Sequence, residues 1–171
     1  MDETNIEIYA REYDKRFKNK DDEHTEKEMK KWLKENRYLG RKEFIKIGLW
    51  KSKRPRKLYE SIWNDDSSVR EITQFSFMAK SELVRVKSLF ALEGVSYPVA
   101  SAILHFAFPN RYPILDFRVI SSLGWEQPTS YNFGFWQKYC KRIRDIAQEF
   151  GEDIRTVDKA LWEFSKSKEK Q

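Results

Sequence analysis

The chain has 171 residues, of which 33 are Lys or Arg and 27 are Asp or Glu, so that its formal net charge is +6. This length fits one ordinary domain. Hydrophobic residues make up 40% of the chain and aromatic residues 15%, a composition that excludes disorder throughout. Cys140 is the only cysteine, which excludes an internal disulfide. One cysteine and two histidines are also too few ligands for a zinc site or a four-cysteine iron–sulfur cluster.

Helix starts are predicted where a hydroxyl stands three residues before a carboxylate, the spacing of a capping box. These pairs are Thr4 with Glu7, Thr25 with Glu28, and Ser68 with Glu71. Apolar residues at helical spacing predict helices over 5–18, 26–36, 56–64, 69–79, 82–91, 98–107, 117–123, 131–149 and 154–166. Residues 19–23 are a polar connection. Only 112–115 looks extended and no alternating strand series occurs, so the predicted class is all-α, with a charged, frayed tail at 166–171.

The densest positive cluster follows an apolar run over 44–49 that ends at Trp50. Five of the seven residues from Lys51 to Lys57 are basic. Pro55 has no N–H to donate and restricts the residue before it, so we expect a helix to break or restart there. The cluster is either a solvated helix end or a surface for phosphate groups.

A tight pair of helices is predicted over 82–107, with Ser81 as the cap of the first helix. The chain turns at 92–96, where Gly94 permits a conformation that residues with a Cβ resist and Val95 can fill the space between the helices. Ser96 can cap the second helix, and Pro98 falls in its first turn. Such a turn exposes N–H groups suited to a phosphate, although helix pairs of this kind are also common packing units.

Two motifs in this region resemble the helix-hairpin-helix DNA glycosylase superfamily, to which endonuclease III and the adenine and 8-oxoguanine glycosylases belong. LEGVSYPVASAIL at 92–104 is similar to its hairpin pattern LPGVGxKTAxxIL, and YPILDFRVISSLG at 112–124 is similar to its aspartate segment. Asp116 stands eighteen positions after Pro98, as the family's aspartate does after its hairpin lysine. The resemblance is strongest over 81–124 and extends back to about Phe44. It implies a two-lobed helical bundle, one domain over 1–165, that acts on DNA.

Two departures from the family pattern bear on the activity. Ser96 replaces the second hairpin glycine, which a helix cap tolerates. Pro98 replaces the lysine that forms a Schiff base in bifunctional members, and it has no amine. Nothing in the sequence aims another lysine at a sugar carbon, and the iron–sulfur motif is missing. The resemblance therefore implies a monofunctional glycosylase, or a protein that has lost catalysis.

Asp116 is the candidate catalytic residue. Breaking the bond between base and sugar develops positive charge on the sugar, which a preorganised carboxylate stabilises while it orients a water molecule. The alternative is that Asp116 caps the helix at 117–123. The two roles are compatible, because a capping carboxylate keeps a second oxygen.

The resemblance also implies which residues contact DNA. Phosphate contacts are expected at Gly94, Val95 and Ser96, with Lys51, Lys53 and Arg54 as further phosphate or gap-filling residues. The aromatic residues expected around a flipped base, each with core packing as its alternative, are Trp50, Phe108, Tyr112 and Trp136.

The chain is thus expected to be a base-excision repair glycosylase that flips a damaged or modified base out of double-stranded DNA. We expect no cofactor. Whether the hairpin binds a monovalent cation, as in some members of the superfamily, is left open. The alternatives are a non-catalytic DNA-binding module and a basic interaction protein. The sequence does not identify the excised base or a preference for the base opposite it. It also does not distinguish DNA from RNA or modified DNA as the substrate.

Two features of the sequence bear on the location of the protein. No stretch approaches the roughly 20 consecutive apolar residues of a membrane helix, and the segment 1–13 is too charged for a signal peptide. We expect a cytoplasmic monomer with no membrane partner, associated with the nucleoid if the source is prokaryotic.

Overall fold

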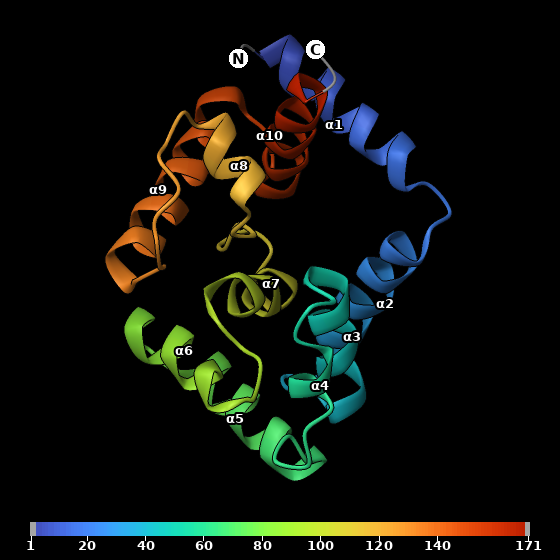
Figure 1. Cartoon of the computed structure of the whole chain (residues 1–171), viewed down its shortest axis with the longest axis vertical. Coiled ribbons are helices and arrows are strands. Elements are labelled where there is room, and N and C mark those ends of the chain that lie inside the picture. Colours follow the sequence, from blue (N-terminus) through green and yellow to red (C-terminus); the bar gives the residue numbers. More distant parts are fainter. Residues whose placement is uncertain (1–2, 170–171) are drawn as a thin grey trace. The chain divides into compact units, whose positions relative to one another are not determined.

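The computed structural model describes residues 3–169, and the secondary structure over that range is entirely helical (Figure 1). The helices are α1 (Glu3–Phe17), α2 (Asp21–Glu35), α3 (Arg41–Lys51), α4 (Arg56–Tyr59), α5 (Asp66–Met78), α6 (Glu82–Ser88), the 3-10 helix η1 (Leu89–Ala91), α7 (Tyr97–Ala107), α8 (Phe117–Ser122), α9 (Phe133–Phe150) and α10 (Ile154–Lys168). The predicted all-α class is confirmed.

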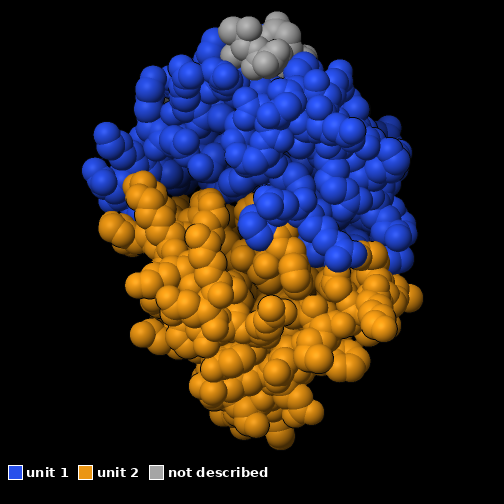
Figure 2. Space-filling view, turned by 180° about the vertical axis from the view of Figure 1, so that it is seen from behind, with its two compact units in different colours: residues 1–20, 109–171 blue, residues 21–108 orange. Residues whose placement is uncertain are grey.

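The chain divides into two compact units, coloured separately in Figure 2. Unit 1 combines the N-terminal segment up to Lys20 with everything from Pro109 onward, and unit 2 is Asp21–Phe108. The expected single domain over 1–165 stays a prediction. No helix of the described chain combines the length and the apolar character that crossing a membrane requires.

Helix α10 is the centre of unit 1 and packs against α1, α8 and α9 (Figure 1). The ring of Trp162 meets the rings of Tyr13 and Phe17 edge to face, with centroid distances of 5.3 and 5.6 Å. Arg16 adds a two-pronged ion pair to Glu163, with N–O distances of 2.5 and 2.8 Å. Helix α1 therefore docks against α10 through aromatic side chains and an ion pair.

Helix α7 is the core helix of unit 2 and contacts α2, α3 and α6 (Figure 1). Its residues from Val99 to Phe106 are all buried. A helix that is apolar on nearly every side must lie inside a domain, because no face of it is suited to water. The helix predicted over 98–107 is confirmed.

Two predicted helix starts are wrong, because acidic residues begin these helices earlier. α2 starts at Asp21 with three acidic residues in its first turn, where they complement the positive end of the helix dipole, so Thr25 lies inside the helix. α5 is capped by Asp65, whose carboxylate accepts the N–H of Ser68 at 2.9 Å, so Ser68 is the capped residue. The side chain of Thr4, the third predicted cap, lies outside the described part.

Two predicted boundaries near helix ends are also wrong. α4 ends at Tyr59 rather than at residue 64, because tertiary hydrogen bonds described below hold the following backbone as a loop. α10 continues to Lys168, beyond the predicted start of the frayed tail. Glu169 holds this end through ion pairs to Arg118 at 2.5 Å and to Lys166 at 2.8 Å. The last two tail residues lie outside the described part.

Candidate functional site

Asp116 occupies the N-cap of α8, as the helix at 117–123 predicted. One carboxylate oxygen accepts the N–H of Arg118 at 3.0 Å. The residue is half-buried, and it ends an irregular segment, 112–115, that is buried throughout. The capping interpretation is therefore confirmed, and the catalytic one stays a prediction.

The backbone of Ile114, two residues before Asp116, is held from two helices. A carboxylate oxygen of Asp158 on α10 accepts the Ile114 N–H at 2.8 Å, and the hydroxyl of Tyr139 on α9 donates to the Ile114 carbonyl at 2.8 Å. Asp158 and Tyr139 are 2% and 0% exposed. Because both polar groups of Ile114 are bonded to buried side chains, the segment that presents Asp116 is fixed.

The two tyrosines around this segment stay protonated at neutral pH. Burial raises the pKa of Tyr139 well above its ordinary value, and the charges of Asp158 and Asp116 raise it further. Burial and the charge of Asp116 likewise raise the pKa of Tyr131. Tyr139 is therefore a lasting donor to Ile114, and both hydroxyls lie within electrostatic reach of Asp116.

We expect Tyr139→Phe to lower the free energy of unfolding by about 1–3 kcal/mol, because it leaves the buried Ile114 carbonyl without its donor. For a chain of this size that corresponds to a fall in Tm of roughly 2–4 °C per kcal/mol. Tyr131→Phe is the matched control, because Tyr131 is only half-buried, and its effect should stay within about 0.5 kcal/mol. If urea unfolding shows an equal loss of unfolding free energy in the two variants, the role given to Tyr139 is contradicted.

The turn at 92–96 in unit 2 is fixed by the side chain of Asn64, which is fully buried. Its amide nitrogen donates to the carbonyl of Glu93 at 3.1 Å, and its amide oxygen accepts the N–H of Glu93 at 2.9 Å. The same nitrogen also bonds the carbonyls of Leu58 and Tyr59 at 3.0 and 3.1 Å. Asn64 thus joins the end of α4 to the turn.

Gly94 is required in this turn for two reasons. Its φ of +86° belongs to a region that L side chains rarely adopt. In addition, a Cβ at this position would lie 2.8 Å from the ring of Tyr59. Gly48 on α3 approaches the same ring, with 2.9 Å to its own Cβ position. The Tyr59 ring therefore fills the space left by two glycines, and burial raises its pKa to about 12.

The other residues of the turn agree only in part with their predicted roles. Pro98 lies in the first turn of α7, as predicted. Ser96 is the N-cap residue of α7, as predicted, but within the described chain its side chain makes no capping hydrogen bond. No described acceptor bonds the N–H groups of Gly94 and Ser96, and Val95 is half-exposed.

The basic segment 51–57 covers the last residue of α3, the connection 52–55 and the first two residues of α4. Lys51 is the last residue of α3 and is half-buried, while Lys53 and Arg54 are exposed. The predicted helix restart at Pro55 is confirmed, since Pro55 is the N-cap of α4. The segment thus has four exposed cations, of which Lys53 and Arg54 lie in the connection and Arg56 pairs with Glu60 at 2.9 Å.

The sequence did not reveal the loop 60–64, called here the Trp63 loop, which lay inside a predicted helix. Its side chains Ile62 and Trp63 are 78% and 74% exposed. The guanidinium of Arg41 donates to three carbonyl oxygens of the loop, two of them at 2.8 Å. Asn64 ties the loop to the turn at 92–96. Two large apolar side chains are thus exposed on a backbone that hydrogen bonds fix.

The four aromatic residues predicted around a flipped base are packed in the two units. In unit 2, Trp50 donates its Nε1–H to the carbonyl of Asp22 at 3.1 Å and meets Phe106 edge to face. In unit 1, Tyr112 and Trp136 are buried and stacked, with an interplanar angle of 16°. Phe108 is half-buried in unit 2. Core packing describes Tyr112 and Trp136, and contact with a base stays a prediction for all four.

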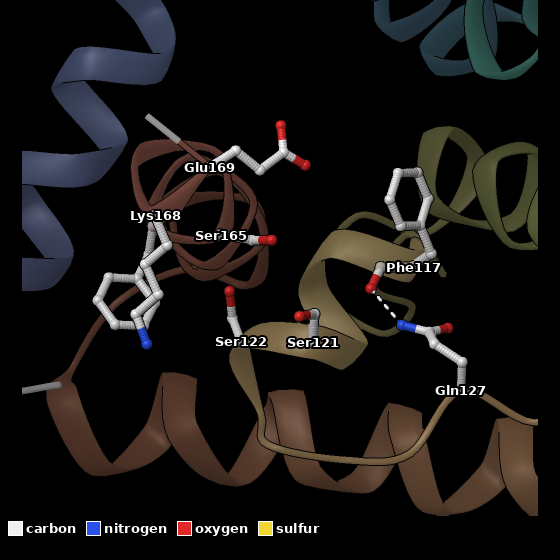
Figure 3. A pocket seen from close by; sticks show the side chains of 8 residues that line it. Phe117, Ser121, Ser122, Gln127, Ser165, Lys168 and Glu169 are labelled. Carbon is white, nitrogen blue, oxygen red and sulfur yellow. Dashed lines mark hydrogen bonds between the residues drawn. The ribbon is translucent and has the colours of Figure 1, made fainter. Parts of the chain in front are cut away.

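A pocket of about 390 Å³ lies beside α8 in unit 1 (Figure 3). It is lined by Phe117, Ser121, Ser122, Gln127, Phe164, Ser165, Lys168 and Glu169. Several of its polar groups are already engaged: Gln127 donates to the Phe117 carbonyl at 2.6 Å, and Ser122 to the Leu161 carbonyl at 2.5 Å. Hydrogen bonds from Arg118 and Lys166 lower the pKa of Glu169 to about 2. Asp116 is not part of this lining.

Among the described residues, no group of three or more His, Cys, Asp or Glu side chains is placed to hold a metal ion. The chain matches no protein-family model, no curated protein and no solved structure. Its resemblance to the helix-hairpin-helix glycosylases therefore rests on the residues of the two motifs.

Proposed function

We propose that the chain is a monofunctional DNA glycosylase that releases a damaged or modified base from duplex DNA with Asp116 as its catalytic carboxylate. The observation that carries the proposal is the placement of Asp116. It is a half-buried carboxylate at a helix N-terminus, directly after a segment that buried hydrogen bonds hold on both sides. A preorganised carboxylate of this kind is what a glycosidic bond cleavage uses.

The reaction is a hydrolysis in which the C1′–N bond breaks and its electron pair leaves with the base. The positive charge that develops at C1′ is stabilised by the carboxylate of Asp116. Water adds at C1′ and gives up a proton, the base acquires one, and the products are a free base and an abasic site. Pro98 has no amine, so the Schiff-base route of the lyases is not assigned to it.

Three neighbouring features of unit 2 support duplex binding. The turn at 92–96 offers the N–H groups of Gly94 and Ser96 to a phosphate. The basic segment supplies cations, and the Trp63 loop, tied to the turn through Asn64, supplies apolar side chains. Apolar side chains of this size enter between base steps in proteins that distort DNA. Flipping costs least at damaged or mismatched pairs, which gives selectivity before the chemistry.

The second candidate is a non-catalytic helix-hairpin-helix DNA-binding protein. It is favoured by the hydrogen bond from the Arg118 N–H to Asp116, which gives this carboxylate a structural role without any chemistry. This candidate predicts duplex binding without base release.

The proposal is tested by single-turnover incubation with labelled duplexes that carry uracil, hydroxymethyluracil, hypoxanthine, 8-oxoguanine or alkylated adenine. We expect strand cleavage at one of these bases only after alkali, because a monofunctional enzyme leaves an abasic site. Cleavage without alkali, together with a covalent adduct trapped by borohydride, would show a lyase instead. Binding of every duplex without release of any base at excess protein would favour the second candidate.

We expect the double variant Lys53→Gln, Arg54→Gln to weaken binding to every duplex by a similar factor, because phosphate contacts carry no base information. The slope of log affinity against log salt should fall by about 0.9 for each phosphate that the variant no longer neutralises. Lys141→Gln, Arg142→Gln is the charge-matched control, with two exposed cations on α9. If both double variants change the slope equally, the basic segment has no special role.

A further inference from the structure

A second pocket, of about 290 Å³, lies wholly within unit 2 and shares no residue with the surroundings of Asp116. Its apolar part includes Leu33 from α2, Met78 from α5, and the side chains of Phe77 and Phe108. The volume lies just below the usual range for small-molecule sites. A pocket of this size suits a single ring system, and its exposed lining residues Lys34 and Arg37 can contact a group that extends from the ring into solvent.

The wall of this Phe77–Phe108 pocket is aromatic and rigid. The rings of Phe77 and Phe108 meet edge to face, with a centroid distance of 5.7 Å and an interplanar angle of 88°. The guanidinium of Arg85 lies 5.2 Å from the Phe108 ring centroid and bonds the carbonyl of Ala79 at the end of α5. Phe108 is held by both contacts, and the part of it that lines the pocket is an apolar surface against which a planar ring can pack.

The other part of the lining is cationic and lacks counter-charges. Lys27 and Lys30 on α2 each pair with a glutamate four residues earlier, at 2.6 and 3.1 Å. Four residues before Lys34 the helix has Lys30, so Lys34 faces a like charge there and not a glutamate. Within the described chain neither Lys34 nor Arg37 has an acidic partner, and both are exposed.

Two unpaired cations beside an aromatic wall define the ligand chemistry. An Arg guanidinium binds phosphate in a bidentate manner and Lys adds a second charge, while the wall accepts a base by stacking. We infer that the Phe77–Phe108 pocket binds a nucleotide, with its base on Phe108 and its phosphate at Lys34 and Arg37. The nucleotide is either free or part of a single strand. Phe108 is also one of the predicted contacts of a flipped base, whereas Lys34 and Arg37 belong to no other predicted site, so these two cations test the inference separately from base release.

The test is isothermal titration of the full chain with adenosine 5′-monophosphate, adenosine, inorganic phosphate and a 5′-phosphorylated single-stranded tetranucleotide. We expect the monophosphate to bind at least tenfold more tightly than adenosine or phosphate alone, because only it engages both parts of the pocket. Comparable affinity for adenosine, or no saturable binding of the monophosphate at millimolar concentration, would overturn the inference. Tighter binding of the tetranucleotide than of the monophosphate would assign the site to a strand, and the reverse to a free nucleotide.

Variants localise the binding. Arg37→Gln and Lys34→Gln should each weaken the monophosphate by about tenfold, since each removes a charged hydrogen bond, and Phe108→Leu should weaken it by a similar factor. Lys31→Gln is the matched control, because Lys31 is an exposed lysine of the same helix outside the lining. An equal loss with Lys31→Gln would overturn the inference, since it would show attraction to general positive charge. Base release measured in parallel on Lys34→Gln and Arg37→Gln should be unchanged, which separates failure of this site from failure of the proposed glycosylase.

Discussion

Asp116→Asn should lower the single-turnover rate of base release by about 10²–10³-fold and leave duplex affinity unchanged. The magnitude is that of removing one preorganised electrostatic group from the site of developing charge. Asparagine is as good an N-cap as aspartate, so the hydrogen bond from the Arg118 N–H is kept. The free energy of unfolding should therefore change by less than about 0.5 kcal/mol. Alkali-dependent strand cleavage, a gel shift and urea unfolding measure the three quantities.

The matched control is Asp153→Asn. Asp153 caps α10 in the same unit and accepts the N–H of Thr156 at 2.8 Å, so it has the structural role of Asp116 without the proposed chemistry. It should leave base release unchanged. If Asp116→Asn releases the base at the rate of the parent chain, Asp116 is only a cap, and the non-catalytic DNA-binding protein becomes the better interpretation.

Gly94→Ala should destabilise the chain by about 2–5 kcal/mol. A Cβ at positive φ costs roughly 1–2 kcal/mol, and forcing a methyl group into a filled space typically costs about 1–3 kcal/mol more. Both costs apply here, because φ is +86° and the Tyr59 ring would lie 2.8 Å from the new atom. The corresponding fall in Tm, by thermal unfolding, is roughly 4–20 °C.

Two other glycines separate these costs. Gly151 has φ +67° and no described atom within 4 Å of its Cβ position, so Gly151→Ala should show the backbone cost alone. Gly48 has no positive φ but a 2.9 Å approach to Tyr59, so Gly48→Ala should show the packing cost without backbone strain, reduced by the roughly 1 kcal/mol that alanine contributes inside helix α3. If Gly94→Ala is no worse than Gly151→Ala, the turn does not rest on Tyr59 as described.

Most helices could be predicted from the sequence, because their signals are local. Pro55 marks the start of α4 and Ser81 caps α6 through the N–H of Val84, as expected. The apolar run of α7 predicts a buried helix, since burial is the only environment in which such a run is stable. The position of Asp116 at the start of α8 follows from the same local logic.

The end of α4 and the display of Trp63 could not be predicted in this way. Both depend on Arg41 and Asn64, which bond the loop backbone from outside the segment. No pattern within 56–64 indicates these partners, so the sequence predicts that the helix continues to residue 64. Likewise, nothing in the sequence indicates that Tyr112 and Trp136 stack on each other in a core.

The sequence by itself determined the all-α class, most helix positions, the need for glycine at position 94 and the carboxylate at the start of α8. These follow from periodicity, capping and backbone sterics, which act over a few residues. Only the tertiary structure decided that Tyr139 and Asp158 hold the segment before Asp116, that Tyr59 fills the space beside Gly94, and that two cations of 34–37 lie beside Phe108. Such contacts join residues far apart in the chain, and folding alone brings them together.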